Sequence, residues 1–454
     1  MKTNFGSGVD MIFVKIIVVA VLVVVMLLPI SLIEALVEER AGNQDEVQRE
    51  ISQKWGGVQH VSGPVLVLPY HKGMDKNMNP IIAYAYFLPD TYNVEGNIAT
   101  EERARTIYKT LVYQSDLQIK GRFGLPDFEK LNIKAEQVLW ADAFALIGVT
   151  HLQGIKNKIV FNMNGQPQIV QPGVSNNSFV SSGLTVNMPL NPDIRNYDFD
   201  FNLALNGSEG LYFTPVGKET KVHLKSPWKT VSFDGDILPS GRILDGNGFD
   251  ADWSVFDYNR NYVQSWVGNN DVVKASSLGV DMRFPVDKYQ MTMRSVKYAI
   301  MFIVLTFVVF FLVELLSKKR IHPVQYLLVS CALVIFYTLL LAISEQLGFG
   351  LSYLISAFAT TALITAYAST MFHNLRQTAM MGGFLTVLYV YLYIILQQES
   401  MALLFGAIGL FIALAIVMFV LRKVKWYKTD EERAKEAIYK ETPPPYIPNE
   451  NDVN

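Results

Sequence analysis

Two stretches of this sequence contain residues with the types and rough spacing of ligand-binding loops. In the first, GLYFTPVGKET, Gly217, Lys218 and Thr220 resemble the end of a phosphate-binding loop. Such a loop needs G-x-x-x-x-G-K-[ST] between a strand and a helix. Here the glycine spacing is wrong, Glu219 stands at the Ser/Thr position, and no helical pattern follows. We therefore expect a hairpin bend at 210–220 rather than a nucleotide site.

The second stretch, DGNGFDAD at 245–252, has the acidic and glycine content of a calcium loop. An EF-hand needs oxygen ligands at positions 1, 3 and 5, glycine at position 6 and glutamate at position 12. Counted from Asp245, those last three positions hold Phe249, Asp250 and Phe256. The pattern favours a glycine-rich turn, and an irregular calcium site is the alternative.

No other pattern for catalysis or metal binding occurs in the sequence. Neither H-E-x-x-H nor G-x-S-x-G is present, and no pair of histidines has metal-ligand spacing. The histidines are His60, His71, His151, His223, His322 and His373. The single cysteine, Cys331, lies in an apolar run, so no internal disulfide can form. We predict a protein that is not an enzyme, with no catalytic, cofactor-binding or metal-ligating residues.

Two carboxylates lie at the ends of long apolar runs. Glu314 precedes Lys318 by four residues, a spacing that suits an ion pair on a helix. Glu345 is expected at the opposite membrane interface. A proton-coupled transporter would need such groups near the middle of the membrane. We interpret both as boundary residues with local partners, and coupling to an ion as the alternative.

Small residues recur every four positions at Ala357, Thr361, Thr365 and Ser369. Such a stripe lets two membrane helices approach closely. We expect it to serve helix packing, with the lining of a pathway as the alternative.

The apolar runs that carry these residues are long enough to span a membrane as helices. Residues 11–33 read as an uncleaved signal-anchor helix with a kink at Pro29, and residues 34–57 as its helical extension, with a break at Gly42. A five-helix transmembrane domain occupies 298–421. Its expected spans are 298–316, 325–343, 351–372, 379–396 and 401–421.

Charge between the spans predicts their orientation. Lys and Arg are concentrated in SKKRIH, HNLRQT and RKVKWYK, whereas SEQLGFG and QQES contain neither. Because cytoplasmic loops are enriched in these cations, six spans result, with both termini in the cytoplasm. The cytoplasmic parts are the arm 1–10 and the segment 422–454, a basic anchor, a short helix and a disordered tail. The PPPY motif in that tail could bind a WW-type module, but we expect a plain tail.

Residues 58–293 have the pattern of a large external β domain. Short alternating or β-branched runs are separated by turn residues, and Asn164-Gly165, Asn206-Gly207 and Asp234-Gly235 each predict a hairpin. We expect an antiparallel all-β, sandwich-like domain, large enough for two packed β units. The expected core anchors are Trp140, Trp228, Trp253 and Trp266.

Composition limits the partners and the compartment. The net charge of −2 gives no support for a nucleic-acid partner. The lipid bilayer is a necessary partner, and an oligomer is compatible with the sequence. A large external domain without disulfides suits the periplasmic side of a bacterial inner membrane.

The chain resembles the CreD family of bacterial inner-membrane proteins. The resemblance is carried by LPISLIEALVEER, SGPVLVLPY, YQSDLQIKGRF, SPWKTVSFDGDILP, GFDADW and the stretch 297–349. It implies an inner-membrane location and an association with cell envelope integrity and envelope-stress responses. It implies no reaction, ligand or catalytic residue.

Three functions remain compatible with the sequence. The first is a non-enzymatic envelope protein whose periplasmic β domain binds a partner protein or an envelope component. The second is a subunit of a transporter or channel, which needs polar residues facing a water-filled cavity. The third is an enzyme that modifies lipid or glycan, which needs carboxylates or histidines clustered in a cleft of the β domain.

Overall fold

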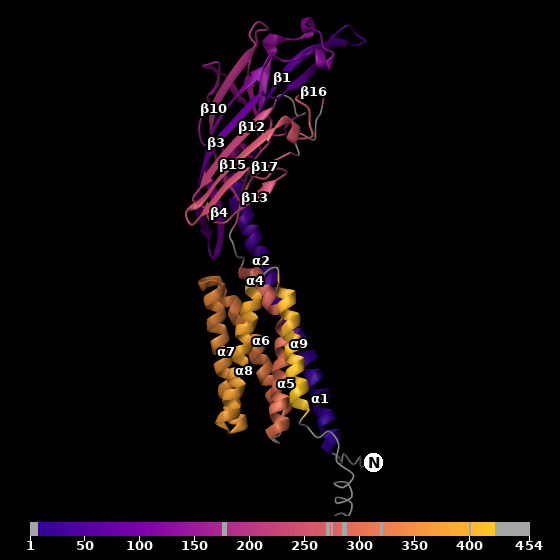
Figure 1. Cartoon of the computed structure of the whole chain (residues 1–454), viewed down its shortest axis with the longest axis vertical. Coiled ribbons are helices and arrows are strands. Elements are labelled where there is room, and N and C mark those ends of the chain that lie inside the picture. The colour runs from indigo at the N-terminus through magenta and orange to yellow at the C-terminus, as the bar shows by residue number, and fades with distance from the viewer. Residues whose placement is uncertain are drawn as a thin grey trace, which may run out of the picture. The chain divides into compact units, whose positions relative to one another are not determined.

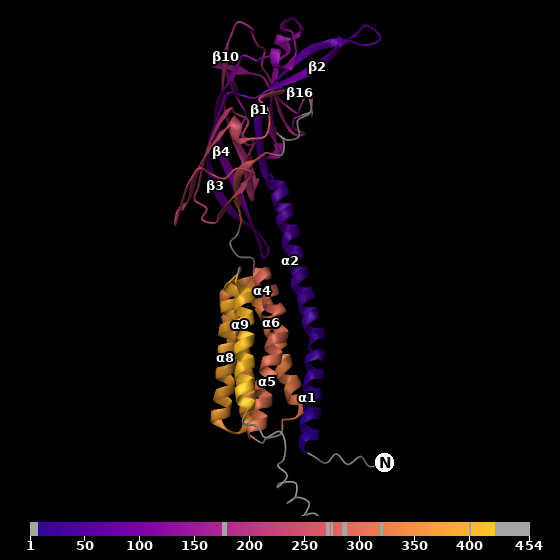
Figure 2. The ribbon, with the colours of Figure 1, turned by 45° about the vertical axis from the view of Figure 1, so that its right-hand side comes forward.

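The computed structural model describes residues 8–174, 179–268, 273, 276–283, 288–317, 321–398 and 401–422 (Figures 1 and 2). The chain forms two compact units. We call Gly42–Pro285 the β unit, and Met1–Ala41 with Val286–Asn454 the helical unit. The predicted tail helix and the PPPY motif lie outside the described residues.

The β unit contains two large sheets. Sheet A has nine strands, ordered β13 (Val231–Gly235), β17 (Leu278–Met282), β11 (Gly210–Phe213), β1 (Gln59–Met74), β5 (Phe144–Val149), β9 (Gly183–Asn187) and β8 (Val170–Pro172), with β2 (Pro80–Phe87) pairing with β1 and with β16 (Ser265–Val267). Sheet B has eight strands, ordered β14 (Gly241–Asp245), β15 (Gly248–Phe256), β12 (Glu219–Ser226), β3 (Thr91–Arg105), β4 (Tyr108–Gly124), β10 (Asn196–Ser208), β6 (Phe161–Met163) and β7 (Gln166–Gln168).

Alternation along the strands builds one hydrophobic core between the two sheets. In β10, Phe199 and Phe201 are buried, whereas Asp198 and Asp200 are exposed, because successive side chains point to opposite faces of a sheet. The buried residues of both sheets belong to a single cluster. The β unit is therefore one large sandwich with a shared core, and the expectation of two packed β units was wrong.

The sheets are mixed, which corrects the prediction of a purely antiparallel domain. β1 pairs in parallel with β11, and β12 pairs in parallel with β3. Parallel neighbours need a long crossover connection, and here the paired strands are far apart in the sequence. The alternation of apolar residues gives the faces of a strand but not the direction of its partner, so the sequence pattern could not reveal these pairs.

Only one of the three predicted hairpins forms. Asn164-Gly165 joins β6 to β7, and both residues have positive φ, 51° and 76°. Asn206-Gly207 instead lies inside β10, where a Cβ on Gly207 would stand 2.2 Å from the Tyr113 hydroxyl. The glycine therefore serves a close contact in a strand rather than a turn.

The other turn predictions also differ from the structure. Asp234-Gly235 lies in β13 and pairs with β17, so it is not a hairpin. The segment 210–220 connects β11 of sheet A to β12 of sheet B, which excludes the expected hairpin bend and still provides no helix for a phosphate loop.

The four tryptophans divide into two pairs. Trp253 and Trp266 are buried in the core, and Trp266 stacks on Tyr86 with 5.3 Å between ring centroids. Trp140 and Trp228 are only half-buried and pack against the margin of the same core.

The helical unit begins with α1 (Gly8–Val25), which is separated by Met26 from α2 (Leu27–Trp55). The break lies three residues before Pro29, whose ring nitrogen cannot donate to the carbonyl of Val25. The expected break at Gly42 is absent, because α2 is helical through that position.

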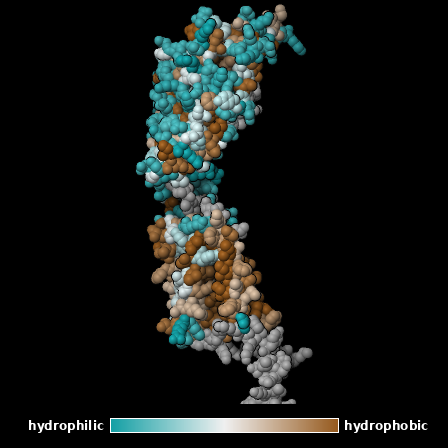
Figure 3. Space-filling model, in the orientation of Figure 1, coloured by the Kyte–Doolittle hydropathy of each residue, from teal (hydrophilic) through white to brown (hydrophobic). Residues whose placement is uncertain are grey.

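In the part of the chain that the structure describes, five further helices follow the β unit after the short α4 (Lys288–Lys297). They are α5 (Ala299–Ser317), α6 (Pro323–Leu347), α7 (Phe349–Phe372), α8 (Leu375–Gln397) and α9 (Ala402–Leu421). Within the described residues, five helices are long and apolar enough to span a membrane, or six if α4 and α5, bent by 43°, count as one span. Their outer surface is mainly hydrophobic, unlike that of the β unit (Figure 3).

The small-residue stripe on α7 lies beside the packed face rather than on it. The residues buried on α7 include Ser352, Ser356, Thr360, Ile364 and Ala368. Of the predicted stripe, Ala357, Thr361 and Thr365 are half-buried and Ser369 is exposed. Thr365 nevertheless contacts α8, since a Cβ on Gly382 would stand 2.8 Å from its Oγ1.

Candidate functional site

The outer face of sheet B carries two rows of polar side chains that cross five strands. The register places Asp116, Asn97, Lys225, Asp250 and Ile243 in one row. The neighbouring row holds Gln118, Glu95, His223, Asp252 and Gly241. Both rows arise from the alternation that buries the intervening residues in the core.

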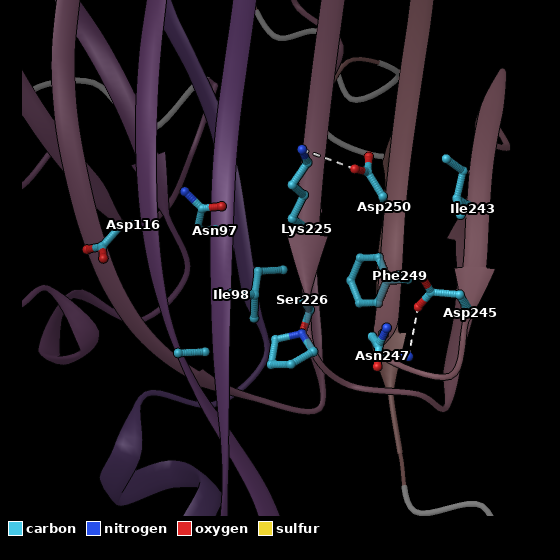
Figure 4. Close-up of a pocket in the computed structure, with 13 residues that line it drawn as sticks. Asn97, Ile98, Asp116, Lys225, Ser226, Ile243, Asp245, Asn247, Phe249 and Asp250 are labelled. Atoms are coloured by element: carbon cyan, nitrogen blue, oxygen red, sulfur yellow. Dashed lines mark hydrogen bonds and ion pairs between the residues drawn. The ribbon is translucent and has the colours of Figure 1, made fainter.

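A groove of about 470 Å³ follows the first row, at the place where β12 ends and β3 continues (Figure 4). Buried Ile98 and Phe249 form its apolar part. Its polar lining comprises Asn97, Asp116, Lys225, Ser226, Asp245, Asn247 and Asp250. The groove thus combines an apolar surface with three carboxylates and one lysine.

Ion pairs hold the polar residues in place. Lys225 Nζ lies 3.1 Å from Asp250 Oδ2, and His223 Nδ1 lies 2.6 Å from Asp252 Oδ1 and 3.6 Å from Asp250 Oδ1 (Figure 4 shows the first pair). Lys225 offsets the charge of Asp250. The two other carboxylates of the lining, Asp116 and Asp245, therefore leave the groove with a net negative charge.

His223, Asp250 and Asp252 could together hold a metal ion. Their ligand atoms lie within 4.8 Å of one another, and no other such group occurs among the described residues. The three side chains are between one-third and about three-fifths exposed, and Lys225 competes for Asp250. The same geometry is therefore also expected of a solvent-exposed network of charged and polar side chains without a metal ion.

Sequence reasoning did not find this cluster. His223 and Asp250 come from strands that are adjacent only in the sheet, so no sequence spacing joins them. The predicted glycine-rich turn is correct, since Gly246 and Asn247 connect β14 to β15. Asp245 there accepts a hydrogen bond from the backbone nitrogen of Asn247 at 2.8 Å.

A buried carboxylate marks one end of the helical unit. Glu314, 8% exposed, forms an ion pair with Lys15 of α1. The Tyr326 hydroxyl donates to Glu314 Oε2 at 3.0 Å, and the backbone nitrogen of Ile321 donates to its Oε1 at 3.0 Å. Glu314 therefore ties α1, α5 and α6 together. Lys318, its predicted partner, lies outside the described residues.

A second charged cluster lies at the opposite end of α6. The Tyr289 hydroxyl donates to Glu345 Oε1 at 3.1 Å, and Arg40 Nε lies 4.0 Å from the same oxygen. Lys288 Nζ donates to the Glu345 carbonyl at 3.3 Å. Both carboxylates that the sequence singled out thus have protein partners near helix ends.

Comparison with known proteins identifies relatives across most of the chain. The family model described as "Inner membrane protein CreD" matches residues 11–427. The curated protein of that name from Escherichia coli (strain K12) is 33% identical over 411 residues, which cover 88% of this chain and 90% of that protein.

Solved structures give only remote matches. An M1 zinc metallopeptidase from Deinococcus radiodurans is 11% identical with a TM-score of 0.21, covering 43% of this chain and 42% of that one. Yeast LTA4 hydrolase is 10% identical with a TM-score of 0.17, covering 37% of this chain and 26% of that one. Likeness at this level carries no argument about activity.

Proposed function

This chain belongs to the CreD family of inner membrane proteins, and from that premise we propose a non-enzymatic role in cell envelope integrity. In this proposal the β unit lies in the periplasm and binds an extended segment of a partner protein. Both termini lie in the cytoplasm, as the alternation of Lys and Arg between the apolar helices supports.

The observation that carries the proposal is the edge strand β14 beside the groove. In the described part of the chain β14 pairs only with β15, and all five of its residues are exposed. Ile243 and Leu244 are 64% and 53% exposed. An unpaired edge that presents large apolar side chains is a template for an added strand.

The chemistry of the groove indicates what that strand would carry. In a hairpin, alternate residues turn their backbone groups toward the partner strand. The backbone N–H and C=O groups of Arg242 and Leu244 therefore point away from β15. Asp245, the last residue of β14, lines the groove and places a carboxylate at this edge. A partner segment with a basic side chain next to an apolar one fits both features.

Site-specific photocrosslinking in living cells tests the proposal. A photoreactive amino acid at Leu244 should capture one defined partner, whereas the same group at exposed Ile169, which does not line the groove, should not. Removal of the charge at this edge by Asp245→Asn, which keeps an acceptor for the Asn247 nitrogen, should reduce the Leu244 crosslink. The matched change Asp193→Asn, outside the groove lining, should leave it unchanged. Equal capture at both positions, or indifference to Asp245→Asn, would contradict the proposal.

The contact of His223 with Asp252 in the β unit is the observation that favours an enzyme. His223→Asn removes the imidazole and keeps a hydrogen-bond donor, so a binding protein should retain its envelope function. Loss of that function with the Leu244 crosslink intact would favour catalysis.

Proton-coupled transport is tested at the two membrane-end carboxylates. Glu314→Gln and Glu345→Gln should leave the envelope phenotype largely intact, because both groups lie near helix ends with local partners. A complete loss from Glu314→Gln, in protein inserted at normal levels, would favour transport.

A further inference from the structure

The helical unit contains buried hydroxyl groups that have no hydrogen-bond partner in the described part of the chain. Tyr337 on α6 is 1% exposed, and Thr306 on α5 and Ser356 on α7 are fully buried. None of these three hydroxyls has a hydrogen-bond partner among the described residues. Serine and threonine hydroxyls in helices can donate to a carbonyl of the preceding turn, as Ser330 and Ser344 do here, whereas Thr306 and Ser356 do not.

The helices bring these groups to one place. The ring of Phe336 lies 4.9, 5.5 and 4.7 Å from the rings of Tyr337, Tyr353 and Tyr389. The Tyr353 hydroxyl donates to the backbone carbonyl of Tyr389 at 2.7 Å.

The remaining hydroxyls join the same cluster through their helical positions. Ser356 follows Tyr353 by one turn of α7, and Thr306 follows Phe302, whose ring is 5.4 Å from that of Tyr389, by one turn of α5. Thr360 follows Ser356 by one further turn of α7, and the buried Tyr389 hydroxyl also has no hydrogen-bond partner among the described residues. We call Thr306, Tyr337, Tyr353, Ser356, Thr360 and Tyr389 the hydroxyl cluster.

Tyr337 lies deep within its helix, whereas Tyr353 lies only four residues after the start of α7. Tyr337 lies near the middle of Pro323–Leu347, so at a rise of about 1.5 Å per residue each end of α6 is roughly 15–20 Å away. In a hydrocarbon surrounding, a polar side chain that lacks a partner is unfavourable, and such residues mark functional positions.

We propose that the hydroxyl cluster binds a neutral hydrogen-bonding ligand between α5, α6, α7 and α8, with water as its smallest occupant. The charged residues of the described parts of α5 to α8, Glu314, Glu345 and Arg376, lie near helix ends. A charged ligand would therefore be buried without a counter-charge, which is strongly unfavourable. The unsatisfied hydroxyls supply both donors and acceptors, as a bound water requires.

A matched pair of substitutions in the full-length protein tests this assignment. Tyr353→Phe removes a hydroxyl that donates to the Tyr389 carbonyl at 2.7 Å, and Tyr337→Phe removes one with no protein partner. If Tyr337 binds water, both variants should lower the thermal unfolding midpoint by a few degrees. If the Tyr337 hydroxyl is dry, its removal relieves an unsatisfied group, so an unchanged or raised midpoint would overturn the proposal.

Radiolytic footprinting of the unmodified protein provides a second measurement that does not depend on variants. A short X-ray pulse converts bound water to hydroxyl radical, so Tyr337 should be oxidised although its side chain is buried. Met381 of α8, 0% exposed and outside the hydroxyl cluster, is the control. Although methionine is intrinsically reactive, it should be modified more slowly than Tyr337. Modification of Tyr337 no faster than that of Met381 would overturn the proposal.

Discussion

The two units place their polar and apolar side chains in opposite ways. In the β unit aromatic and aliphatic residues fill the core, and Asp, Asn, Lys and Glu cover the outer face of sheet B. In the helical unit Phe358 and Phe411 are 75% and 73% exposed, whereas Ser352 and Ser356 are fully buried. The contrast is expected if the first unit folds in water and the second in lipid, since lipid removes the hydrophobic drive between helices and favours small or polar residues at their contacts.

The largest expected effect tests the β unit's core. Trp253→Ala should lower the free energy of unfolding of the β unit by about 3–5 kcal/mol, because its buried indole contacts Phe233 and donates to the Ile237 carbonyl. Trp228→Ala, at a half-buried position, should cost clearly less. Urea unfolding of residues 42–285, followed by circular dichroism, measures both. An equal loss of unfolding free energy in the two variants would contradict the placement of Trp253 in the core and of Trp228 at its margin.

Two adjacent glycines on α8 test the packing inside the helical unit. Gly382→Leu should destabilise the full-length protein by about 1–3 kcal/mol, because Thr365 of α7 occupies the space of a Cβ. Gly383→Leu is the control, since a Cβ there meets nothing within 4 Å. Thermal unfolding in detergent distinguishes them. Equal tolerance at both positions would contradict close packing of α7 on α8.

A smaller effect concerns pH and His60 in the β unit. Burial lowers the pKa of His60 below its usual 6.5, and its Nε2 lies 3.0 Å from Thr214 Oγ1. Because the unfolded chain binds this proton more readily, stability should be greatest above pH 6.5 and should fall as the pH decreases toward the folded pKa. His60→Gln, which keeps a donor for Thr214, should flatten the stability profile between pH 7 and 5.

Carboxylates affect folding stability at a lower pH than His60 does, so the two contributions to the stability profile can be separated. Hydrogen bonds from the Asn79 backbone lower the pKa of Asp75 below its usual 3.8, so the stability from this group is lost only in more acidic solution. A profile that keeps its full slope between pH 7 and 5 in His60→Gln would exclude His60 as the cause.

Features that depend on local periodicity could be predicted from the sequence. The apolar runs between 298 and 421 gave the helices, and alternation gave the strands, because lipid exposure and a half-buried sheet each impose a repeat on neighbouring residues. Glycine turns were less predictable. Gly165 turns the chain, whereas Gly207 makes room for Tyr113, and the two dipeptides are identical in sequence.

Features that depend on distant partners could not be predicted. The row that joins His223 to Asp252 exists only because β12 pairs with β15, and the groove exists only because β12 leaves β3 after its parallel pairing. The hydroxyl cluster likewise joins residues from four helices, each unremarkable in its own apolar run.

Cysteine accessibility tests most directly whether the β unit lies in the periplasm and the C-terminal segment in the cytoplasm. In the Cys331→Ser background, Asn247→Cys in the exposed β14–β15 turn and Asn449→Cys near the C-terminus are treated with a membrane-impermeant maleimide in intact spheroplasts. We predict labelling of the cysteine at 247 in intact cells, and labelling of the cysteine at 449 only after lysis. Labelling at 449 before lysis, or protection at 247, would contradict the periplasmic placement of the β unit and the cytoplasmic C-terminus.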